Sequence, residues 1–323
     1  MRRSSIFASL IALLLAAGCN SSPAAQPTDR ANPGPPSHEP PITALRAPVG
    51  LATVGEKLWA VSSAEDQVVE VDPATGAVGR RVPVGATPLR VAAVNDQLWV
   101  TVFRAGKVVV VDTKTARVVR EVALGGGPEG ITAAFGSVWV VRQDARRLTR
   151  LDPSGKVLGE VPLPGKPRLV AATARHVWVS DYAGGTLTRV DPTTKAVRTT
   201  PKACDGAQGL AANPAILWVT CTRSNEVLAV EATAMRLMGR ATVPAEPDAI
   251  RFIEGRLFLV STAGPSLVEL RGDPEAPAIR KVTALGNGAP LADAANLDLA
   301  AAGGRIWVSS FRDNGLFAVA FLE

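Results

Sequence analysis

Tryptophan recurs along this chain at a nearly constant interval. Five of the six tryptophans follow one another at 39 or 40 residues, and the full set is Trp59, Trp99, Trp139, Trp178, Trp218 and Trp307. Phe258 fills the one gap, 40 residues after Trp218 and 49 residues before Trp307. A fixed period of this length indicates a repeated structural unit. The sequence therefore predicts seven copies of one unit rather than two unrelated domains.

Two other residue types follow the same period. An acidic residue stands 13 positions after the aromatic residue in five units, at Asp72, Asp112, Asp152, Asp191 and Glu231. A proline stands 11 positions before it in five units, at Pro48, Pro88, Pro128, Pro167 and Pro247. Ala207 and Asn296 replace that proline in the fifth and seventh units. Because Asp and Pro both favour turns, each unit is expected to place its turns in the same order.

Each unit contains four short apolar segments separated by turn residues. In the third unit these segments cover 130–134, 137–141, 148–151 and 157–163. The segment around each tryptophan is an almost continuous apolar run, which is typical of a strand buried on both faces. Seven four-stranded antiparallel sheets around one axis form a β-propeller. We therefore predict an all-β fold, a seven-bladed β-propeller.

The two ends of the repeat region predict how the ring closes. The seventh unit ends after its third segment, 316–320, and has no fourth. Residues 42–45, just before the first unit, are similar to residues 282–285, the fourth segment of the sixth unit. We expect an N-terminal strand formed by residues 42–45 to complete the last blade.

The N-terminus has the features of an export signal. Arg2 and Arg3 precede an apolar stretch, 6–17, that is too short to span a membrane. The stretch ends in Leu-Ala-Ala-Gly-Cys at 15–19, which resembles the lipobox of bacterial lipoproteins. That resemblance implies cleavage before Cys19 and lipidation of its thiol and amine. The alternative is an ordinary secretory peptide with a chance cysteine.

The following segment, rich in Pro, Ser and Ala, contains too little apolar surface to form a core and is expected to be a tether. Three regions follow from this division, a lipoprotein signal peptide (1–18), a flexible tether (19–41) and the propeller (42–323). Asn20 is not the Asp that lipoproteins use for inner-membrane retention. We expect the chain to be exported and anchored through Cys19, at the outer membrane facing the periplasm in a Gram-negative cell and otherwise at the cell surface.

The repeats allow a family resemblance to be stated. The sequences GGGPEGITAAFGSVWV (125–140) and RLTRLDPSGKV (147–157) resemble the YVTN/YncE-like seven-bladed propellers and, more distantly, the NHL and virginiamycin B lyase propellers. The resemblance covers about residues 42–323. It implies the fold and not the activity, because propellers carry many unrelated functions.

Two of the three cysteines are expected to pair. Cys204 precedes the first strand of the fifth unit, and Cys221 follows Trp218 by three residues. In a propeller these two loops lie on the same face. Export favours oxidation, and YncE-like propellers often place cysteines similarly. We expect a Cys204–Cys221 disulfide, with two buried free thiols as the alternative.

The uniform tryptophans are expected to pack between blades rather than to stack on a ligand. Ligands of propellers usually bind the face formed by loops that lead into the first strand and loops that follow the second, which we call the connecting face. Residues there differ from unit to unit, so they can be functional, or they can form an ordinary solvated rim. The candidate binding residues are Arg90, Phe103, Arg104, Glu129, Arg142, Arg168, Asp181, Tyr182, Gln208, Arg223, Asp248, Phe311 and Arg312. Additional loop length at 286–295 enters on this face.

Two classes of function remain open from the sequence. The first is a non-catalytic, monomeric module that binds a protein, a peptide or another envelope ligand, for which Arg and aromatic residues are suited. The alternative is a metal-dependent lyase or lactonase of the virginiamycin B lyase or gluconolactonase type. Glu129, Asp248 and Asp298 could hold a hard cation, but Arg90 and Arg168 in the same ring oppose it.

Other functions lack support in the sequence. His38 lies in the tether and His176 at a position where the other units carry unrelated residues, so neither is expected to be catalytic. No catalytic residue, metal, quinone or other cofactor is predicted. The net charge is +6, but the basic residues are scattered, so no nucleic-acid partner is expected.

Overall fold

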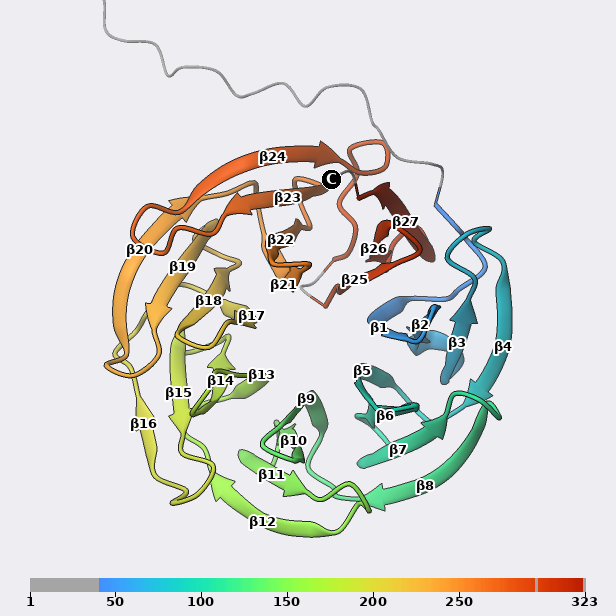
Figure 1. Ribbon diagram of the computed structural model, residues 1–323, viewed down its shortest axis with the longest axis horizontal. Coiled ribbons are helices and arrows are strands. Elements are labelled where there is room, and N and C mark those ends of the chain that lie inside the picture. Colours follow the sequence, from blue (N-terminus) through green and yellow to red (C-terminus); the bar gives the residue numbers. More distant parts are fainter. Residues whose placement is uncertain (1–40, 294–295, 322–323) are drawn as a thin grey trace, which may run out of the picture. The chain divides into compact units, whose positions relative to one another are not determined.

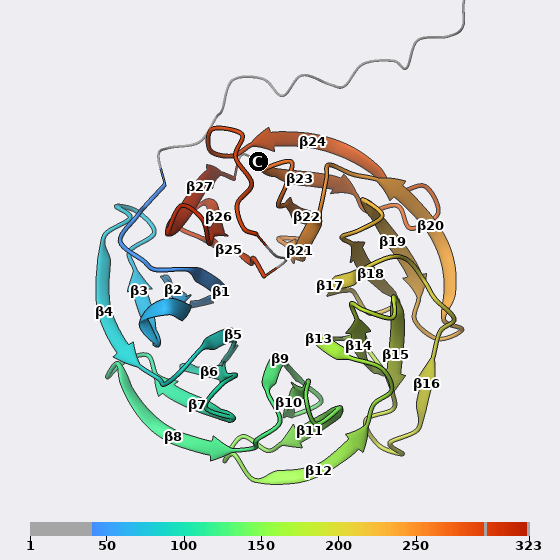
Figure 2. The ribbon, with the colours of Figure 1, turned by 180° about the vertical axis from the view of Figure 1, so that it is seen from behind.

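The computed structural model describes residues 41–293 and 296–321, which form seven antiparallel sheets arranged in a ring (Figure 1). The predicted seven-bladed β-propeller is confirmed. Figure 2, which views the ring from behind, shows the same order of strands from the centre to the circumference in every blade. Cys19, His38, the predicted signal peptide (1–18) and all but the last residue of the predicted tether (19–41) lie outside the described residues. Within the described part, no helix is long and apolar enough to cross a membrane.

The strands occupy four positions in each blade. The innermost strands are β1 (Pro48–Val54), β5 (Pro88–Val94), β9 (Pro128–Ala134), β13 (Pro167–Ala172), β17 (Ala207–Ala212), β21 (Pro247–Ile253) and β25 (Leu299–Ala302). The second strands are β2 (Lys57–Ser62), β6 (Gln97–Val102), β10 (Ser137–Arg142), β14 (Val177–Asp181), β18 (Ile216–Cys221), β22 (Arg256–Ser261) and β26 (Arg305–Ser310). The third strands are β3 (Gln67–Val71), β7 (Lys107–Asp112), β11 (Arg147–Leu151), β15 (Thr186–Val190), β19 (Glu226–Glu231), β23 (Ser266–Arg271) and β27 (Gly315–Ala320).

Six blades have a fourth, outermost strand. These strands are β4 (Val78–Pro83), β8 (Arg117–Ala123), β12 (Val157–Pro162), β16 (Val197–Thr199), β20 (Arg236–Thr242) and β24 (Ala278–Ala284). One short 3-10 turn, η1 (Ser63–Glu65), follows β2. The outermost strands are largely exposed, whereas the second strands are almost fully buried. Solvent therefore meets the circumference of the ring, and the core lies between the blades.

The tryptophans form the contacts between neighbouring blades. All six are at most 2% exposed, and Phe258 is 4% exposed. Trp59 of the first blade packs with Val91 and Leu98 of the second, and Trp139 of the third packs with Val177 of the fourth. The prediction that these rings are structural is confirmed. Burying one such side chain removes about 150–250 Å² from water.

The periodic acidic residues fix the turn between the third and fourth strands. The Asp72 Oδ1 accepts hydrogen bonds from the N–H groups of Ala74 and Thr75, both at 3.0 Å. Asp191 accepts equivalent bonds two and three residues ahead, at 2.8 and 2.7 Å. The pKa of Asp72 is lowered to about 2. The hydrogen bond from Lys57 has the largest effect, and the hydrogen bonds from the turn N–H groups have the next largest. This register is therefore structural.

Neighbouring innermost strands approach closely where each begins. A Cβ atom built on Gly130 would lie 2.5 Å from the Arg168 carbonyl oxygen, and one on Gly209 would lie 2.1 Å from that of Asp248. Side chains in the second strands complete these contacts, because the Thr101 hydroxyl donates to the Glu129 carbonyl at 2.8 Å. Ser180 makes the corresponding bond at 2.9 Å. The backbone of each blade is thereby held against the next at the connecting face.

The ring closes at the predicted place but by a shorter contact than predicted. β25, β26 and β27 form a three-stranded sheet, and Ile42 forms one antiparallel bridge to Leu316, with N···O distances of 2.9 and 3.0 Å. The expected strand 42–45 does not form, because only five residues separate Ile42 from the start of β1 and the chain must turn toward it. Leu45 is 1% exposed and packs with Trp307.

Deleting residues 42–47 is expected to lower the melting temperature of the whole ring. The deletion removes the Ile42 bridge and the buried Leu45, whose burial alone contributes about 1.5–3 kcal/mol. It also removes the Ala47 N–H that donates to the Asn314 Oδ1 at 3.0 Å, a link to the seventh blade. Thermal unfolding measures the effect, with a six-residue deletion at 26–31 as the control. Equal melting temperatures for the two deletions would show that the closure is wrong.

Candidate functional site

Four of the candidate residues form a hydrogen-bonded chain across neighbouring blades. The Arg168 Nε donates to the Glu129 Oε1 at 2.8 Å, and its Nη1 donates to the Gln208 Oε1 at 3.0 Å. The Gln208 Nε2 in turn donates to the Asp248 Oδ1 at 3.0 Å. These residues all stand one position after the start of an innermost strand, so the repeat places them at one level of the ring.

The chain continues into the seventh and second blades. The Leu297 N–H donates to the Asp248 Oδ2 at 2.6 Å. Arg90 donates through Nη1 to the Leu297 carbonyl and through Nη2 to the Asn296 Oδ1, both at 2.8 Å. We call the set Glu129, Arg168, Gln208, Asp248, Asn296, Leu297 and Arg90 the polar layer. It links six of the seven blades near the connecting face.

The polar layer corrects one expectation. The alternative interpretation of these positions, an ordinary solvated rim, would leave their side chains in solvent. Glu129 is 3% exposed, Gln208 and Asp248 are 0% exposed, and Arg90 is 7% exposed. The reason is that innermost strands converge at the axis, where side chains from several blades cover one another. Burial raises the pKa of Asp248, and the charge of Arg90 acts in the opposite direction.

A hollow of about 270 Å³ lies on the connecting face, beside the polar layer. We call it the mouth hollow. Its lining residues are Leu89, Phe103, Glu129, Gln143, Lys166, Arg168, Tyr182, Ala183 and Asn296. Four of the candidate residues from the sequence, Phe103, Glu129, Arg168 and Tyr182, are therefore brought together here.

Tyr182 contacts two arginines at the edge of this hollow. The guanidinium carbon of Arg168 lies 5.4 Å from the centre of the Tyr182 ring, and that of Arg223 lies 4.9 Å from it. The Arg223 Nη2 also donates to the Tyr182 carbonyl at 3.1 Å. Such cation–π contacts are worth about 0.5–1 kcal/mol each at exposed sites. These two contacts restrain the half-buried ring.

The remaining candidate residues do not join this group. Asp181 is buried and accepts from the Gly184 N–H at 2.9 Å, which fixes its own turn. Arg142 pairs with Glu160 of the outermost strand of its blade. Arg312 pairs with Asp293 at 2.5 Å, Phe311 is 41% exposed, and Arg104 is exposed.

The predicted disulfide is present in the fifth blade. Cys204 and Cys221 are bonded, with 5.9 Å between their Cα atoms. The cross-linked loop reaches the residues of the mouth hollow, because a Cβ built on Gly206, two residues after Cys204, would lie 3.3 Å from the Tyr182 ring. The disulfide therefore braces the loop against which Tyr182 and Arg223 rest.

Replacing both cysteines by serine is expected to destabilise the propeller by about 3 kcal/mol, the value that the chain-entropy description assigns to a loop of this length. The measurement is denaturant unfolding of the Cys204→Ser/Cys221→Ser variant, with the reduced wild-type protein as a matched second state. Both should unfold at a lower denaturant concentration than the oxidised protein. An unchanged midpoint in both would contradict a stabilising disulfide.

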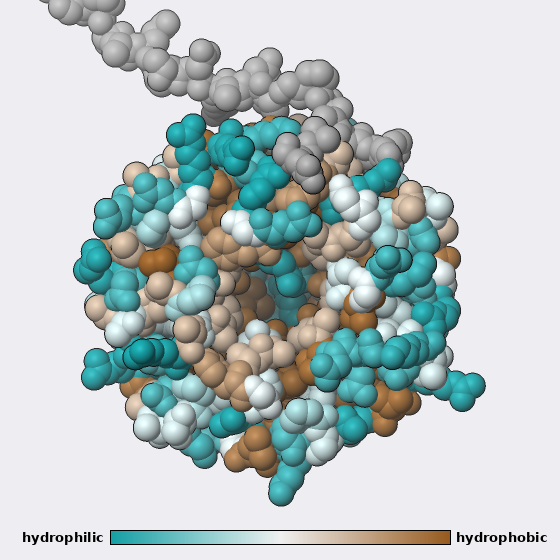
Figure 3. Space-filling view, in the orientation of Figure 1, coloured by the Kyte–Doolittle hydropathy of each residue, from teal (hydrophilic) through white to brown (hydrophobic). Residues whose placement is uncertain are grey.

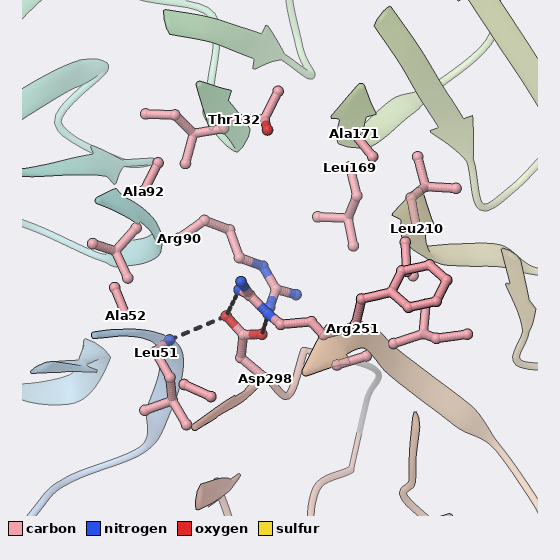
Figure 4. A pocket seen from close by; sticks show the side chains of 18 of the residues that line it. Leu51, Ala52, Arg90, Ala92, Thr132, Leu169, Ala171, Leu210, Arg251 and Asp298 are labelled. Atoms are coloured by element: carbon pink, nitrogen blue, oxygen red, sulfur yellow. Dashed lines mark hydrogen bonds and ion pairs between the residues drawn. The ribbon is translucent and has the colours of Figure 1, made fainter. Parts of the chain in front are cut away.

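Sequence reasoning missed the arginine at the centre of the ring. In six blades the tryptophan of the second strand pairs with a small residue of the innermost strand. In the remaining blade, the sixth along the chain, Phe258 pairs with Arg251. The small residues are Ala52, Ala92, Thr132, Ala171, Ala211 and Ala300. Arg251 extends toward the axis (Figure 4). The signal was present in the repeat as one long charged residue in an otherwise small register.

Those small residues leave a central cavity of about 700 Å³. It appears in Figure 3 as a hollow at the centre of the ring, with atoms of hydrophilic residues inside it. The cavity extends from Arg90 to Glu254, which follows the end of β21, and shares no lining residue with the mouth hollow. We call it the channel.

Asp298 pairs with Arg251 inside the channel (Figure 4). The Arg251 Nε donates to Oδ1 at 2.8 Å and its Nη2 donates to Oδ2 at 2.7 Å. The side chain of Asp298 is 5% exposed, whereas that of Arg251, which lines the open space of the channel, is 43% exposed. The pair is bidentate, the strong geometry for such contacts.

The carboxylates considered as cation ligands are each bonded to other groups. Glu129 pairs with Arg168, Asp248 accepts from Gln208 and Leu297, and Asp298 pairs with Arg251. Among residues 41–293 and 296–321, no three His, Cys, Asp or Glu residues are grouped so that they could hold a metal ion.

The fold and the site define the chain as a seven-bladed β-propeller with a polar layer near one mouth of its channel. A selenomethionine-substituted virginiamycin B lyase from Staphylococcus aureus is similar, with a TM-score of 0.70, 16% identity and coverage of 88% of this chain and 98% of the lyase chain. A Kuenenia stuttgartiensis hydrazine synthase chain is similar with a TM-score of 0.70, 14% identity and coverage of 86% and 96%.

The WD40 domain of Neurospora crassa Pan2 gives a TM-score of 0.65 at 11% identity, covering 86% of this chain and 92% of that domain. At such identities the similarity shows the fold alone. No protein-family model and no curated protein matches the sequence.

Proposed function

We propose that this propeller is a lipid-anchored, non-catalytic binding module of the bacterial envelope that binds a protein or peptide segment at the mouth hollow. Cys19 provides the membrane attachment, and residues 19–41 act as the tether. The resemblance to the YVTN/YncE-like repeats is in keeping with this role, because it implies a fold and no particular reaction.

The observation that carries the proposal is the contact of the Tyr182 ring with both Arg168 and Arg223 beside the mouth hollow. Tyr and Arg are enriched among residues that dominate protein interfaces. A ring already restrained by two guanidinium groups loses less side-chain entropy on binding than a free one. Phe103 adds an apolar surface in the same hollow, and Lys166 adds an exposed charge.

The polar layer supports binding rather than bond cleavage at this mouth. Each of its carboxylates accepts hydrogen bonds from other members of the layer, and each of its guanidinium groups donates to other members, so the layer is a rigid base for the hollow. A segment that rests on it meets Phe103 and Tyr182 as apolar anchors and Lys166 as a charged contact. Such a mixture suits a short peptide segment with an acidic side chain beside an apolar one.

Removing the side chains of Tyr182 and of Arg223, which contacts it, tests this proposal. We expect the Tyr182→Ala/Arg223→Ala variant to lose the partner that copurifies with the wild-type chain after chemical crosslinking of intact envelopes. The matched control is Arg117→Ala, an exposed position on the outermost strand β8, which should retain that partner. Equal recovery of the same partner by all three chains would contradict binding at the mouth hollow.

A further inference from the structure

The outer edge of the seventh blade is only partly paired. β26 and β27 pair over six consecutive residues without a register shift. On the opposite edge of β27, the backbone pairing within the described residues is limited to the bridge between Leu316 and Ile42. Residues 43–47 then lead away from this edge toward Asn314, whose side chain accepts from the Ala47 N–H at 3.0 Å. The part of the edge beyond Leu316 is therefore left open.

The direction of the peptide groups along β27 shows which of them remain unpaired. In an antiparallel strand, alternate residues direct both their N–H and their C=O groups to the same edge. Leu316 bonds outward through both groups, so Ala318 and Ala320 direct theirs outward as well. Phe321 fits this alternation, because its N–H donates to the Gly304 carbonyl on the β26 side at 3.0 Å. Within the described part of the chain, the outward groups of Ala318 and Ala320 have no partner.

β27 also lacks the features that protect the edges of the other blades. Each of the six outermost strands contains at least one charged residue. Five of them also have a register shift in their pairing with the third strand. Charges and bulges of this kind hinder an edge from pairing with another chain. β27 reads Gly-Leu-Phe-Ala-Val-Ala, without charge or proline, so its edge is suited to accept a further strand.

The space at this edge admits one strand. The seventh sheet has three strands and the others have four, and Figure 1 shows β24 and β4 on the circumference on either side of β27. One strand fewer leaves a recess about 4.8 Å deep, the spacing of paired strands. A second propeller cannot bring a whole blade into this recess, because β24 and β4 flank it. A single extended segment fits there, as the fourth strand does in the other six blades.

The chain's own sequence before Ile42 is unsuited to continue the strand. In an antiparallel continuation of the bridge between Ile42 and Leu316, position 40 would lie opposite Ala318. That position is Pro40, which has no N–H to donate to the Ala318 carbonyl, and Pro41 follows it. Proline occurs in strands where its missing N–H would face away from the partner strand. The outward groups of Ala318 are therefore available to a strand of another chain.

A hollow of about 40 Å³ beside the edge selects one side chain of an added strand. Phe258, Leu267 and Val319 form its buried apolar wall, and the exposed Lys281 lies at its rim. Val319 packs in one cluster with Phe258 and Leu267 of the sixth blade. Side chains directly opposite each other in an antiparallel pair lie on the same face. The residue opposite Val319 in an added strand therefore points into this hollow, which suits an apolar side chain.

We propose that the seventh blade binds an extended, proline-free segment of a second protein as its fourth strand, antiparallel to β27 and with an apolar residue opposite Val319. The outward N–H and C=O groups of Ala318 and Ala320 supply the main-chain hydrogen bonds. The hollow supplies the side-chain selection, which is how sheet edges recognise added peptide strands. This edge shares no lining residue with the mouth hollow and does not depend on the function proposed there.

Fluorescence anisotropy with a labelled peptide, Gly-Gly-Ala-Ile-Arg-Lys-Val, tests the proposal on the full chain carrying Cys19→Ser. The last five residues are 278–282 of β24, which in the sixth blade lie opposite the positions equivalent to 317–320. We expect saturable binding that N-methylation of the lysine weakens at least about tenfold, because its N–H faces the Ala318 carbonyl. N-methylation of the valine, whose N–H faces away, should change the affinity less than about twofold. Equal effects of the two methyl groups, or no saturable binding, would overturn the proposal.

A matched pair of substitutions tests the same edge from the side of the protein. Ala320→Pro removes an outward N–H of β27, and Ala123→Pro changes an equally exposed alanine at the end of β8. We expect the first to weaken peptide binding at least about tenfold and the second to leave it unchanged. Unchanged binding by a folded Ala320→Pro protein would overturn the proposal. A wild-type chain that dimerises in sedimentation experiments, and that Ala320→Pro makes monomeric, would assign the edge to a second copy and would overturn it as well.

Discussion

Replacing Trp99 by alanine is expected to lower the free energy of unfolding by about 3–5 kcal/mol. The Trp99 side chain is 0% exposed and lies in one apolar cluster with Val138 and Val140 of the third blade and Leu151. Removing it leaves a cavity between two blades that a closed ring cannot easily collapse. The measurement is equilibrium denaturant unfolding of the Trp99→Ala protein.

Phe311→Ala is the matched control for this prediction. Phe311 is also aromatic but is 41% exposed on the connecting face, so its removal should change stability by no more than about 0.5 kcal/mol. If both substitutions had similar small effects, the tryptophan register would not be the packing contact between blades. The role of the repeated aromatic residues would then have to be sought in binding.

Asp298→Ala is expected to destabilise the propeller by about 3 kcal/mol, the effect of removing one partner from a buried ion pair. The substitution leaves Arg251 without a counter-charge and leaves the N–H groups of Leu51 and Leu299 without their acceptor. The loss should lie at the lower end of the usual range, because 43% of the Arg251 side chain still reaches water.

The control for Asp298 is Asp293→Ala. Asp293 pairs with Arg312 but its side chain is 85% exposed, so this pair should contribute less than about 1 kcal/mol. The double variant Asp298→Ala/Arg251→Ala should be less destabilised than the two single variants added together, since the charge that Asp298 balances is gone. A loss below about 1 kcal/mol for Asp298→Ala would show that the pair does not stabilise the ring.

The repeat made most of the fold predictable. A strand with Trp at its centre and apolar neighbours can be buried only between two sheets, so period and composition together lead to blades around an axis. The acidic turn residues were predictable because Asp72 and its equivalents bond to N–H groups two and three residues ahead, a local contact. The disulfide followed from Cys204 and Cys221 lying on the same face.

The burial of the polar layer could not be predicted in the same way. Its bonds join residues about 40 positions apart, such as Arg168 to Gln208, and depend on the direction of each side chain near the axis. The sequence predicted the correct place for the contact that closes the ring. It did not show that the path of residues 43–47 toward β1 reduces this contact from a strand to one bridge at Ile42. Arg251 was visible in the repeat only after the small residues opposite the tryptophans had been aligned with it.

Binding at the mouth hollow is tested most directly by photo-crosslinking in intact cells. A benzophenone amino acid is placed at position 103, which lines the hollow, or at position 119, where Val119 is 48% exposed on the outermost strand β8. We predict a discrete crosslinked partner from position 103 that is absent from position 119 and is lost when Tyr182→Ala is added. The absence of any adduct from position 103, or the same adduct from both positions, would contradict binding at this mouth of the propeller.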